Sequence, residues 1–381
     1  MATDGGDSYE QRVTPLELFF DLVFVFALTQ VTGFLADHLT WIGVLQGAAL
    51  LAVLWSSWAV YSWLTNAVPA EDVIPARIVI FLAMAAMFVA SLAVPGAFGH
   101  YGVIFGLAYF VVQLLQVLLY VVATGSEAEQ RRAILRLAPG FVGAPVLLIV
   151  AGFLDGYAQG ALWALALVIG YGVAEVRGVS GFRIHAGHFA ERHGLVVIIA
   201  LGESIVAAGV GVSGLALRAG VIVAVVVGIA LAAALWWAYF DLVMLTAERR
   251  LSAADGEERA RLARDCYSYL HLPMVAGIIF VSLGVKQTLS HVGDPLGTVP
   301  ATALCGGVAL YLLGHNGFRL RGIGSVSVPR LVMTMLCLAL IPMAVTVPSL
   351  VTLTVLAVLL CGLAAFETTT SRAFRHELRA R

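Results

Sequence analysis

Charged side chains are scarce in this chain of 381 residues: Asp, Glu, Lys and Arg make up 12% of it, while hydrophobic residues make up 61%. A soluble domain carries about twice that charged fraction, and the mean hydropathy of +0.96 also favours a membrane protein. The net charge of −1 gives no reason to expect a nucleic-acid partner. Cysteine is rare as well, and the absence of CxxC spacing favours small packing residues over disulfides or metal ligands at Cys266, Cys305, Cys337 and Cys361.

Motifs typical of enzymes and cofactor sites are also missing. The chain has no Gly-rich phosphate loop, and residues 202–204 (GES) lack the GxSxG frame of a nucleophile elbow. The histidines within residues 185–193 have neither HExxH nor tetrahedral-ligand spacing, so we expect no metal and no cofactor. The opening sequence MATDGGDSYEQRVTP lacks a basic region and a cleavage site, so we expect no cleaved signal peptide.

Apolar segments recur along the whole chain, and each is long enough to cross a bilayer, which takes about 20 residues. The pattern predicts an all-α, polytopic membrane bundle of about 12 transmembrane helices without a sizeable soluble domain. A turn around Pro348 separates the last two segments, so a merged or re-entrant pair is the alternative there. The expected spans lie near residues 15–36, 41–64, 74–95, 100–123, 134–154, 159–177, 194–213, 219–245, 267–289, 299–317, 330–347 and 349–368.

Positive charges are distributed unevenly among the connecting segments. With the N-terminus placed in the cytoplasm, twenty of the 22 Lys and Arg residues fall in cytoplasmic segments, Arg192 and Arg330 among them. Only Arg218 and Lys286 then fall outside. The positive-inside rule therefore predicts that both chain termini are cytoplasmic.

Features of the first half recur in the same order in the second half. Prolines lie deep in two corresponding predicted helices, at Pro145 and Pro342, and the sixth and twelfth predicted helices both end near a glutamate, Glu175 and Glu367. Such matches predict two six-helix repeats of the same orientation, related by an axis along the membrane normal. The repeats would comprise residues 1–185 and 186–381.

The second predicted repeat contains an additional charged segment, residues 248–265. Its alternating acidic and basic residues are typical of a solvated helix with ion pairs between neighbouring turns. We therefore expect a short cytoplasmic helix that connects two membrane spans.

Two acidic residues lie in the first predicted helix. Thr14, Pro15 and Glu17 occupy the N-cap, N1 and N3 positions of a capping box, which accounts for Glu17. Asp21 lies one turn deeper on the same face, where no cap accounts for it. An ionised Asp near the middle of a spanning helix costs roughly 2.5–3.5 kcal/mol. Asp21 is therefore predicted either to pair with a basic residue such as Arg12 or to line a polar pathway.

Glu203 lies near the middle of the predicted span 194–213, between Gly202 and Ser204. Small residues allow neighbouring helices to approach closely. Acidic residues inside membranes usually mark ion or proton pathways, so Glu203 is the best single candidate for a protonatable or ion-coordinating group. A carboxyl group that only connects helices by hydrogen bonds is the alternative.

Other polar residues in the apolar segments are weaker candidates. Asp241 lies in an FDLV sequence that repeats residues 20–23, and His271 could titrate near neutral pH. Gln113 and Gln116 occupy places that match His315 and Asn316 in the other half, where we favour helix packing over a cavity lining. Supporting roles beside a polar pathway are assigned to Arg12, Glu17, Ser204, Glu191, Arg192 and Lys286.

Three long motifs resemble one bacterial family. They are PLELFFDLVFVFALTQV at residues 15–31, HFAERHGLVVIIALGESIVAAG at 188–209 and YSYLHLPMVAGIIF at 267–280, and they are similar to the bacterial low temperature requirement A (LtrA) family. The resemblance covers essentially the whole chain. It implies a multi-pass protein of the bacterial inner (plasma) membrane.

Residues 19–24 (FFDLVF) also look like the Phe-Ser-Asp signature that opens each six-helix repeat of the lysosomal and prokaryotic potassium channels. Those channels also occur as two six-helix repeats in one chain. In this chain Phe20 replaces the serine, and the arginine before the motif is displaced to Arg12.

Three classes of function follow from these observations. We favour a channel or secondary transporter that moves a cation, a proton or a small solute past Asp21 and Glu203, because repeated halves place binding sites near the midplane. One alternative is an intramembrane enzyme with Glu203, His271 or His188 as acid–base groups. The other is a membrane sensor or assembly protein without flux. The lipid bilayer is the expected environment, and a homo-oligomer is left open.

Overall fold

The computed structural model describes residues 12–68, 71–125, 127–211, 218–241 and 243–370. All regular elements of more than one residue within these ranges are helical, and 11 of the helices are long and apolar enough to cross a membrane. The predicted all-α, polytopic membrane bundle is thus confirmed.

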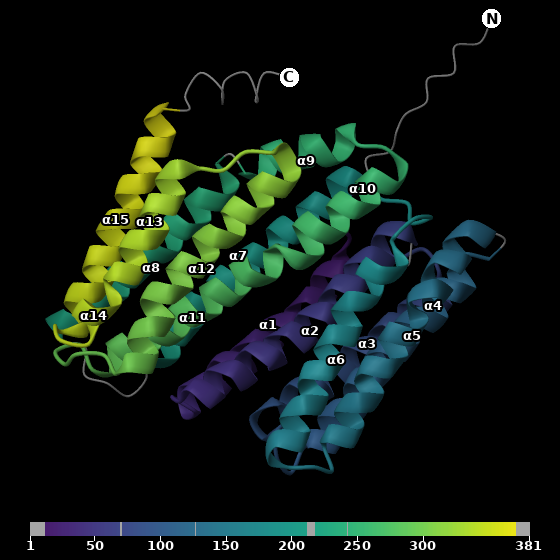
Figure 1. The fold of residues 1–381 in the computed structure, drawn as a ribbon, viewed down its shortest axis with the longest axis horizontal. Helices are drawn as coiled ribbons and strands as arrows, with labels where there is room; N and C mark the ends of the chain where they lie inside the picture. The colour runs from purple at the N-terminus through teal and green to yellow at the C-terminus, as the bar shows by residue number, and fades with distance from the viewer. Residues whose placement is uncertain (1–11, 69–70, 126, 212–217, 242, 371–381) are drawn as a thin grey trace, which may run out of the picture.

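The first six long helices form one side of the molecule (Figure 1). Threonine hydroxyls cap the first two helices, because Thr14 accepts a hydrogen bond from the Glu17 amide and Thr40 accepts one from the Gly43 amide. The predicted capping box at the start of α1 is complete. The helices are α1 (Pro15–Asp37), α2 (Trp41–Ala67), α3 (Ile74–Ala93) with the 3-10 turn η1 (Val94–Gly96), α4 (Gly102–Ala123), α5 (Ala128–Ala151) and α6 (Gly156–Arg177).

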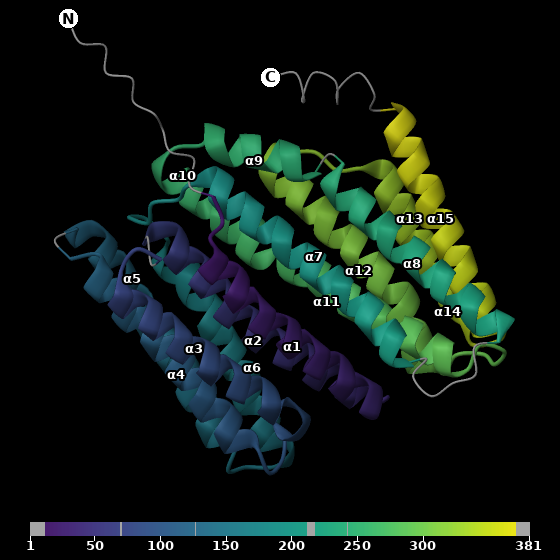
Figure 2. The ribbon, with the colours of Figure 1, turned by 180° about the vertical axis from the view of Figure 1, so that it is seen from behind.

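The remaining helices form the other side, and α1 and α2 lie between them and α3–α6 (Figure 2). Helix α1 contacts both α7 and α11 across this boundary. The elements are α7 (Ala186–Gly211), α8 (Ala219–Phe240), α9 (Val243–Ala253), α10 (Gly256–Leu262), the π-helical segment η2 (Ala263–Tyr269), α11 (His271–Ser290), α12 (Thr298–Ile323), α13 (Val328–Ala339), α14 (Ile341–Ala344) and α15 (Ser349–Thr370).

Two predicted spans differ from the structure in ways that matter below. Helix α7 begins at Ala186 and not near residue 194, so His188, Glu191 and Arg192 are helical residues and do not lie in a loop. The predicted span 330–347 is divided into α13 and the short α14. Pro342 has no amide hydrogen to continue the helical hydrogen bonds, which explains why α13 ends before it.

The charged segment 248–265 forms most of two helices, α9 and α10, where one was predicted. The predicted ion pairs between neighbouring turns are present, with Arg261 Nη2 2.7 Å from Glu257 Oε1. Arg321 of α12 also pairs with Glu258 and Asp265. These two helices lie at the same end of the bundle as the start of α1 and the end of α15 (Figure 2). We call this end the N-terminal side.

Helices α11 and α12 form a close crossing that orders the second group. A Cβ atom on Gly277 would lie 2.6 Å from the carbonyl oxygen of Gly307, and one on Gly307 would lie 2.7 Å from that of Gly277. Only glycine fits at such a backbone approach, as in other membrane helix pairs. The crossing fixes α11, which packs against α7 and α1.

Candidate functional site

Two carboxylates of α1 face one guanidinium of α7 inside the bundle. Glu17 and Asp21 lie one helical turn apart, so both point from the same face of α1. Arg192 Nη1 donates to Glu17 Oε1 at 2.9 Å, and Arg192 Nη2 donates to Asp21 Oδ1 at 2.8 Å. The exposed fractions of these three residues are 3% for Glu17, 1% for Asp21 and 0% for Arg192. The three side chains form a buried ion cluster between the two groups of helices.

Helix α2 supplies further partners for this cluster. Trp58 Nε1 donates to Asp21 Oδ1 at 2.8 Å, and its ring lies 5.7 Å from the Arg192 guanidinium carbon. Arg192 Nη1 also lies 2.6 Å from the hydroxyl oxygen of Thr65. These contacts fix the guanidinium between α1 and α2. A buried ion pair is favourable only when such hydrogen bonds offset the cost of removing its charges from water.

His188 extends the cluster by one turn of α7. Its Nε2 lies 3.0 Å from Glu17 Oε2, and its Nδ1 lies 2.9 Å from the side-chain nitrogen of Asn66. Asn66 is held in turn by the His185 backbone, since its Oδ1 accepts from the His185 amide at 2.9 Å. His188 therefore places an imidazole in direct contact with a carboxylate of the cluster.

The cluster contains more negative than positive charge. Two carboxylates share one guanidinium, so with neutral His188 the formal charge is −1. Asp21 Oδ2 has no hydrogen-bond partner within the described ranges. Unbalanced charge is costly in a buried site, so the arrangement is suited to take up one proton or one small cation.

A pocket of about 460 Å³ lies beside the cluster, near the N-terminal end of α1. This volume lies within the range of about 300–1,000 Å³ that is usual for ligand sites. His185 lines this pocket. Its partial burial and the nearby His188 and Arg259 lower its pKa. The polar part of its lining is rich in carboxylates and consists of Thr14, Glu17, Thr65, Asn66, Glu71, Asp72 and His185.

Glu203 occupies a second buried site further along the same helix pair. Thr29 Oγ1 of α1 donates to Glu203 Oε2 at 2.5 Å. Lys286 of α11 is close enough for an electrostatic attraction to this carboxylate. Next to it, Ser204 Oγ lies 2.6 Å from Ser282 Oγ of α11. Glu203 therefore joins α7 to α1, but its partners differ from those of Asp21.

An apolar layer separates the two acidic sites. Asp21 and Thr29 are eight residues apart on α1, which corresponds to about 12 Å along the helix. Phe24, Ala27 and Leu28 lie between them in the sequence and are 0% exposed. In this conformation the two predicted pathway residues border the same helix interface at different depths.

The other candidate residues lie away from both acidic sites. Asp241 is half-buried at the end of α8, and the Leu242 of its FDLV sequence lies outside the described residues. His271 is buried, with Nε2 2.8 Å from the hydroxyl of Tyr239. Arg12 is exposed, so the proposed pairing of Asp21 with Arg12 is wrong and Arg192 takes that place. Glu191 is exposed as well and accepts from the Val13 amide at 3.3 Å.

Among the described residues, the three candidate acid–base groups Glu203, His271 and His188 form no hydrogen bond with one another. Glu203, His271 and His188 have different hydrogen-bond partners, on α1, α8 and α2 respectively, with Glu17 as a second partner of His188. Within the described parts of the chain, no three His, Cys, Asp or Glu side chains are grouped so that they could hold a metal ion.

The sequence analysis missed a second buried arginine cluster. Arg330 was counted among the cytoplasmic cations, yet it is 3% exposed and pairs with Glu367 of α15 through two hydrogen bonds of 2.8 Å. Its Nη1 also lies 3.0 Å from His315 Nδ1 of α12. Arg192 was likewise predicted to lie in a connecting segment, whereas it is a buried residue of α7. The i, i+4 spacing of His188 and Arg192, beside an acidic first helix, was the signal that could have revealed the charged cluster.

Comparison with known proteins gives a consistent assignment. The family model described as "Bacterial low temperature requirement A protein (LtrA)" matches residues 12–365. A curated relative from Rhizobium meliloti (strain 1021), the uncharacterized protein RA0937, is 33% identical over 312 residues, which covers 78% of this chain and 75% of that protein. No solved structure matches the chain. Because the family model covers nearly all of the helical core, this multi-pass membrane protein belongs to the bacterial LtrA family.

Proposed function

We propose that this protein transports a proton or a small cation across the bacterial inner membrane, with Glu17 and Asp21 as the binding carboxylates. The observation that carries the proposal is the buried cluster in which these two acids share only Arg192. Ionisable groups inside a membrane bundle usually belong to ion or proton pathways. A bound proton or cation would bring the formal charge of this cluster to zero.

The surroundings of the cluster support a route from one side of the membrane. The acidic pocket beside Glu17 gives water and cations a way in from the N-terminal side. The apolar residues between Asp21 and Thr29 close the way toward Glu203. We infer a conformation that is open toward the N-terminal side, which the distribution of Lys and Arg assigns to the cytoplasm.

Transport through this site requires the two groups of helices to move relative to each other. We propose that they are the two repeats expected from the sequence, and their neighbour patterns support this. Helix α1 contacts α2 and α3, while α3 contacts α4 and α4 contacts α5. In the same order α7 contacts α8 and α11, while α11 contacts α12 and α12 contacts α13. Arg192 would then connect the repeats, and a bound cation would compete with it for Asp21.

Flux into proteoliposomes tests this proposal. The purified protein is reconstituted with a pH-sensitive dye inside the vesicles, and gradients of H⁺, Na⁺ or K⁺ are imposed. We expect flux above that of empty vesicles, with strong loss in Asp21→Asn and in Glu17→Gln, because each variant removes the excess negative charge. Glu203→Gln should also reduce flux, since Glu203 borders the same helix interface.

The matched control is Asp37→Asn, which changes an exposed acid at the last residue of α1. It should leave the flux unchanged. Wild-type vesicles that pass none of these ions, or an Asp21→Asn variant with full flux, would contradict the proposal.

A further inference from the structure

Lys286 is the only lysine in this chain, and the other 21 of the 22 basic residues are arginines. It is half-buried near the end of α11 that lies away from the N-terminal side. Lysine carries a compact charge on a flexible stem of four carbons, whereas the planar fork of arginine suits fixed pairs such as those of Arg192. A charge that has to move between two positions is therefore better placed on a lysine.

The side chain of Lys286 lies on the face of α11 that meets α7. Ser282 marks this face, because its hydroxyl oxygen is 2.6 Å from that of Ser204 on α7. Lys286 follows Ser282 by four residues, so the two side chains lie on the same face, one turn apart. Long side chains on a helix lean back toward its N-terminus, which directs Lys286 toward the level of Ser204 and its neighbour Glu203. The electrostatic attraction between Lys286 and the Glu203 carboxylate agrees with this direction.

Glu203 differs from the other two buried acids of the described ranges, because no basic side chain is in direct contact with it. Glu17 and Asp21 both pair with Arg192. No ion pair within 4.0 Å joins Glu203 to another described residue. An ionised carboxylate that is only 1% exposed requires a neutralising charge nearby. Lys286, which already attracts this carboxylate from the neighbouring turn, is the residue placed to supply that charge.

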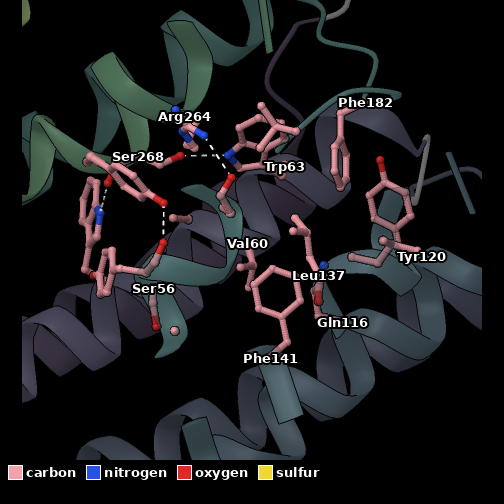
Figure 3. Close-up of a pocket in the computed structure, with 18 residues that line it drawn as sticks. Ser56, Val60, Trp63, Gln116, Tyr120, Leu137, Phe141, Phe182, Arg264 and Ser268 are labelled. Atoms are coloured by element: carbon pink, nitrogen blue, oxygen red, sulfur yellow. Dashed lines mark hydrogen bonds between the residues drawn. The ribbon is translucent and has the colours of Figure 1, made fainter. Parts of the chain in front are cut away.

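Helix α11 itself is held in place at two points in this conformation. It continues from η2, where the carbonyl and hydroxyl groups of Ser268 accept hydrogen bonds from Trp55 and Trp63 of α2 at 2.6 and 2.8 Å. Figure 3 shows the contact between Ser268 and Trp63. The glycine crossing described above holds the middle of the helix against α12. The stem of Lys286 is therefore the part of α11 best suited to carry a charge toward Glu203 or away from it.

We propose that Lys286 is a tethered substitute for the transported ion. Its ammonium group neutralises Glu203 while no proton or cation is bound there, and it withdraws when one arrives. The Glu203 site is then neutral whether or not it is loaded, so no buried carboxylate is left unpaired when the ion departs. The inference rests on the transport function proposed above, and it makes Glu203 the second station of the path, after Glu17 and Asp21.

Amine acetylation tests whether the Lys286 ammonium group serves Glu203. The purified full-length protein in lipid nanodiscs is treated with acetic anhydride, and mass spectrometry follows the acetylation of Lys286, the only lysine amine. Acetylation needs the free amine, so an ammonium group beside a carboxylate reacts slowly. Glu203→Gln removes this carboxylate and should raise the acetylation rate several-fold. The matched control Asp37→Asn changes an exposed acid at the last residue of α1 and should leave the rate unchanged.

Flux in proteoliposomes tests whether this charge is needed for transport. Lys286→Met removes the charge from a side chain of similar shape and should lower the flux by roughly tenfold or more, because Glu203 then lacks a neutralising partner. Lys286→Arg keeps the charge and should retain more flux than Lys286→Met. Size-exclusion profiles and melting temperatures confirm that each variant is folded.

Two results would overturn this inference. One is an acetylation rate of Lys286 that is the same in Glu203→Gln as in the wild type, because the ammonium group would then point away from the carboxylate. The other is full flux in Lys286→Met. A wild type without flux would instead contradict the transport function, so the two failures are distinguishable.

Discussion

The protein buries two arginines inside its membrane bundle, and the two are balanced differently. Arg330 of α13 forms a two-pronged pair with the single carboxylate of Glu367, and its Nη2 also donates to the Ala238 carbonyl at 2.9 Å. Arg192 of α7 divides its guanidinium between Glu17 and Asp21. The Arg330–Glu367 pair is therefore charge-balanced, with the partly buried Arg319 as a further cation nearby, and the Arg192 cluster carries an excess negative charge.

The two clusters also differ in what they connect. The partners of Arg330 lie on α8, α12 and α15, all in the second group of helices. Arg192 connects α7 to α1 and α2 of the first group. A balanced pair within one group is suited to hold that group together. An unbalanced cluster between groups is suited to respond to a proton or cation, and this difference can be tested with matched variants.

Removing each arginine should give the largest effects. Arg192→Leu leaves two facing carboxylates in a buried site, and breaking a buried ion pair costs about 3–5 kcal/mol. Arg330→Leu should cost less, because the Glu367 side chain is 17% exposed and water can reach it. Melting temperatures of the purified variants in detergent show which of the two substitutions destabilises the protein more.

A triple variant provides the control for this prediction. Adding Glu17→Gln and Asp21→Asn to Arg192→Leu removes all formal charge from the cluster, so it should recover part of the lost stability. If Arg192→Leu and Arg330→Leu destabilise the protein equally, the two clusters do not differ in the way proposed from their charges.

Removing one carboxylate from each cluster should change the stability by different amounts. Glu367→Gln leaves Arg330 buried without an anion, which should cost about 3 kcal/mol. Asp21→Asn leaves Arg192 with Glu17, so the cluster becomes neutral, and the new amide oxygen can still accept from Trp58. We expect a stability change within about 1 kcal/mol for this variant. Melting temperatures again measure the effect, and a larger loss for Asp21→Asn would show that its charge is needed for folding.

The sequence predicted the helices well because hydropathy is a local property. The capping box of Thr14 and Glu17 and the apolar spans depend only on neighbouring residues, and the structure contains them. The interruption at residues 340–342 was harder to predict, because Pro145 lies inside an unbroken α5 while Pro342 lies beyond the end of α13. Proline indicates where a helix can break, and the packing around it decides whether it does.

The candidate site was less predictable, because its contacts depend on the tertiary structure. Asp21 and Arg192 are 171 positions apart, and no local pattern indicates that α1 and α7 are neighbours. The charges of Glu191, Arg192 and His193 lower the local hydropathy, which moved the predicted start of α7 to residue 194 and placed Arg192 in the cytoplasm. In the structure, Glu17 and Asp21 of another helix neutralise that arginine, so it is buried.

The smallest expected effect on stability, and the sharpest test of the comparison, comes from the two histidines. His188 contacts Glu17 in the unbalanced cluster, and His315 contacts Arg330 in the balanced one. Glutamine can replace either ring as a hydrogen-bonding group but cannot carry a proton, so both variants should stay within about 1 kcal/mol of the wild type. His188→Gln should lose most of the proton flux in proteoliposomes, because the imidazole that could pass a proton to Glu17, one of the two binding carboxylates, is gone. His315→Gln should keep that flux, because the charge of Arg330 is already balanced by Glu367. An equal loss of flux in both variants would mean that charge balance does not distinguish the clusters.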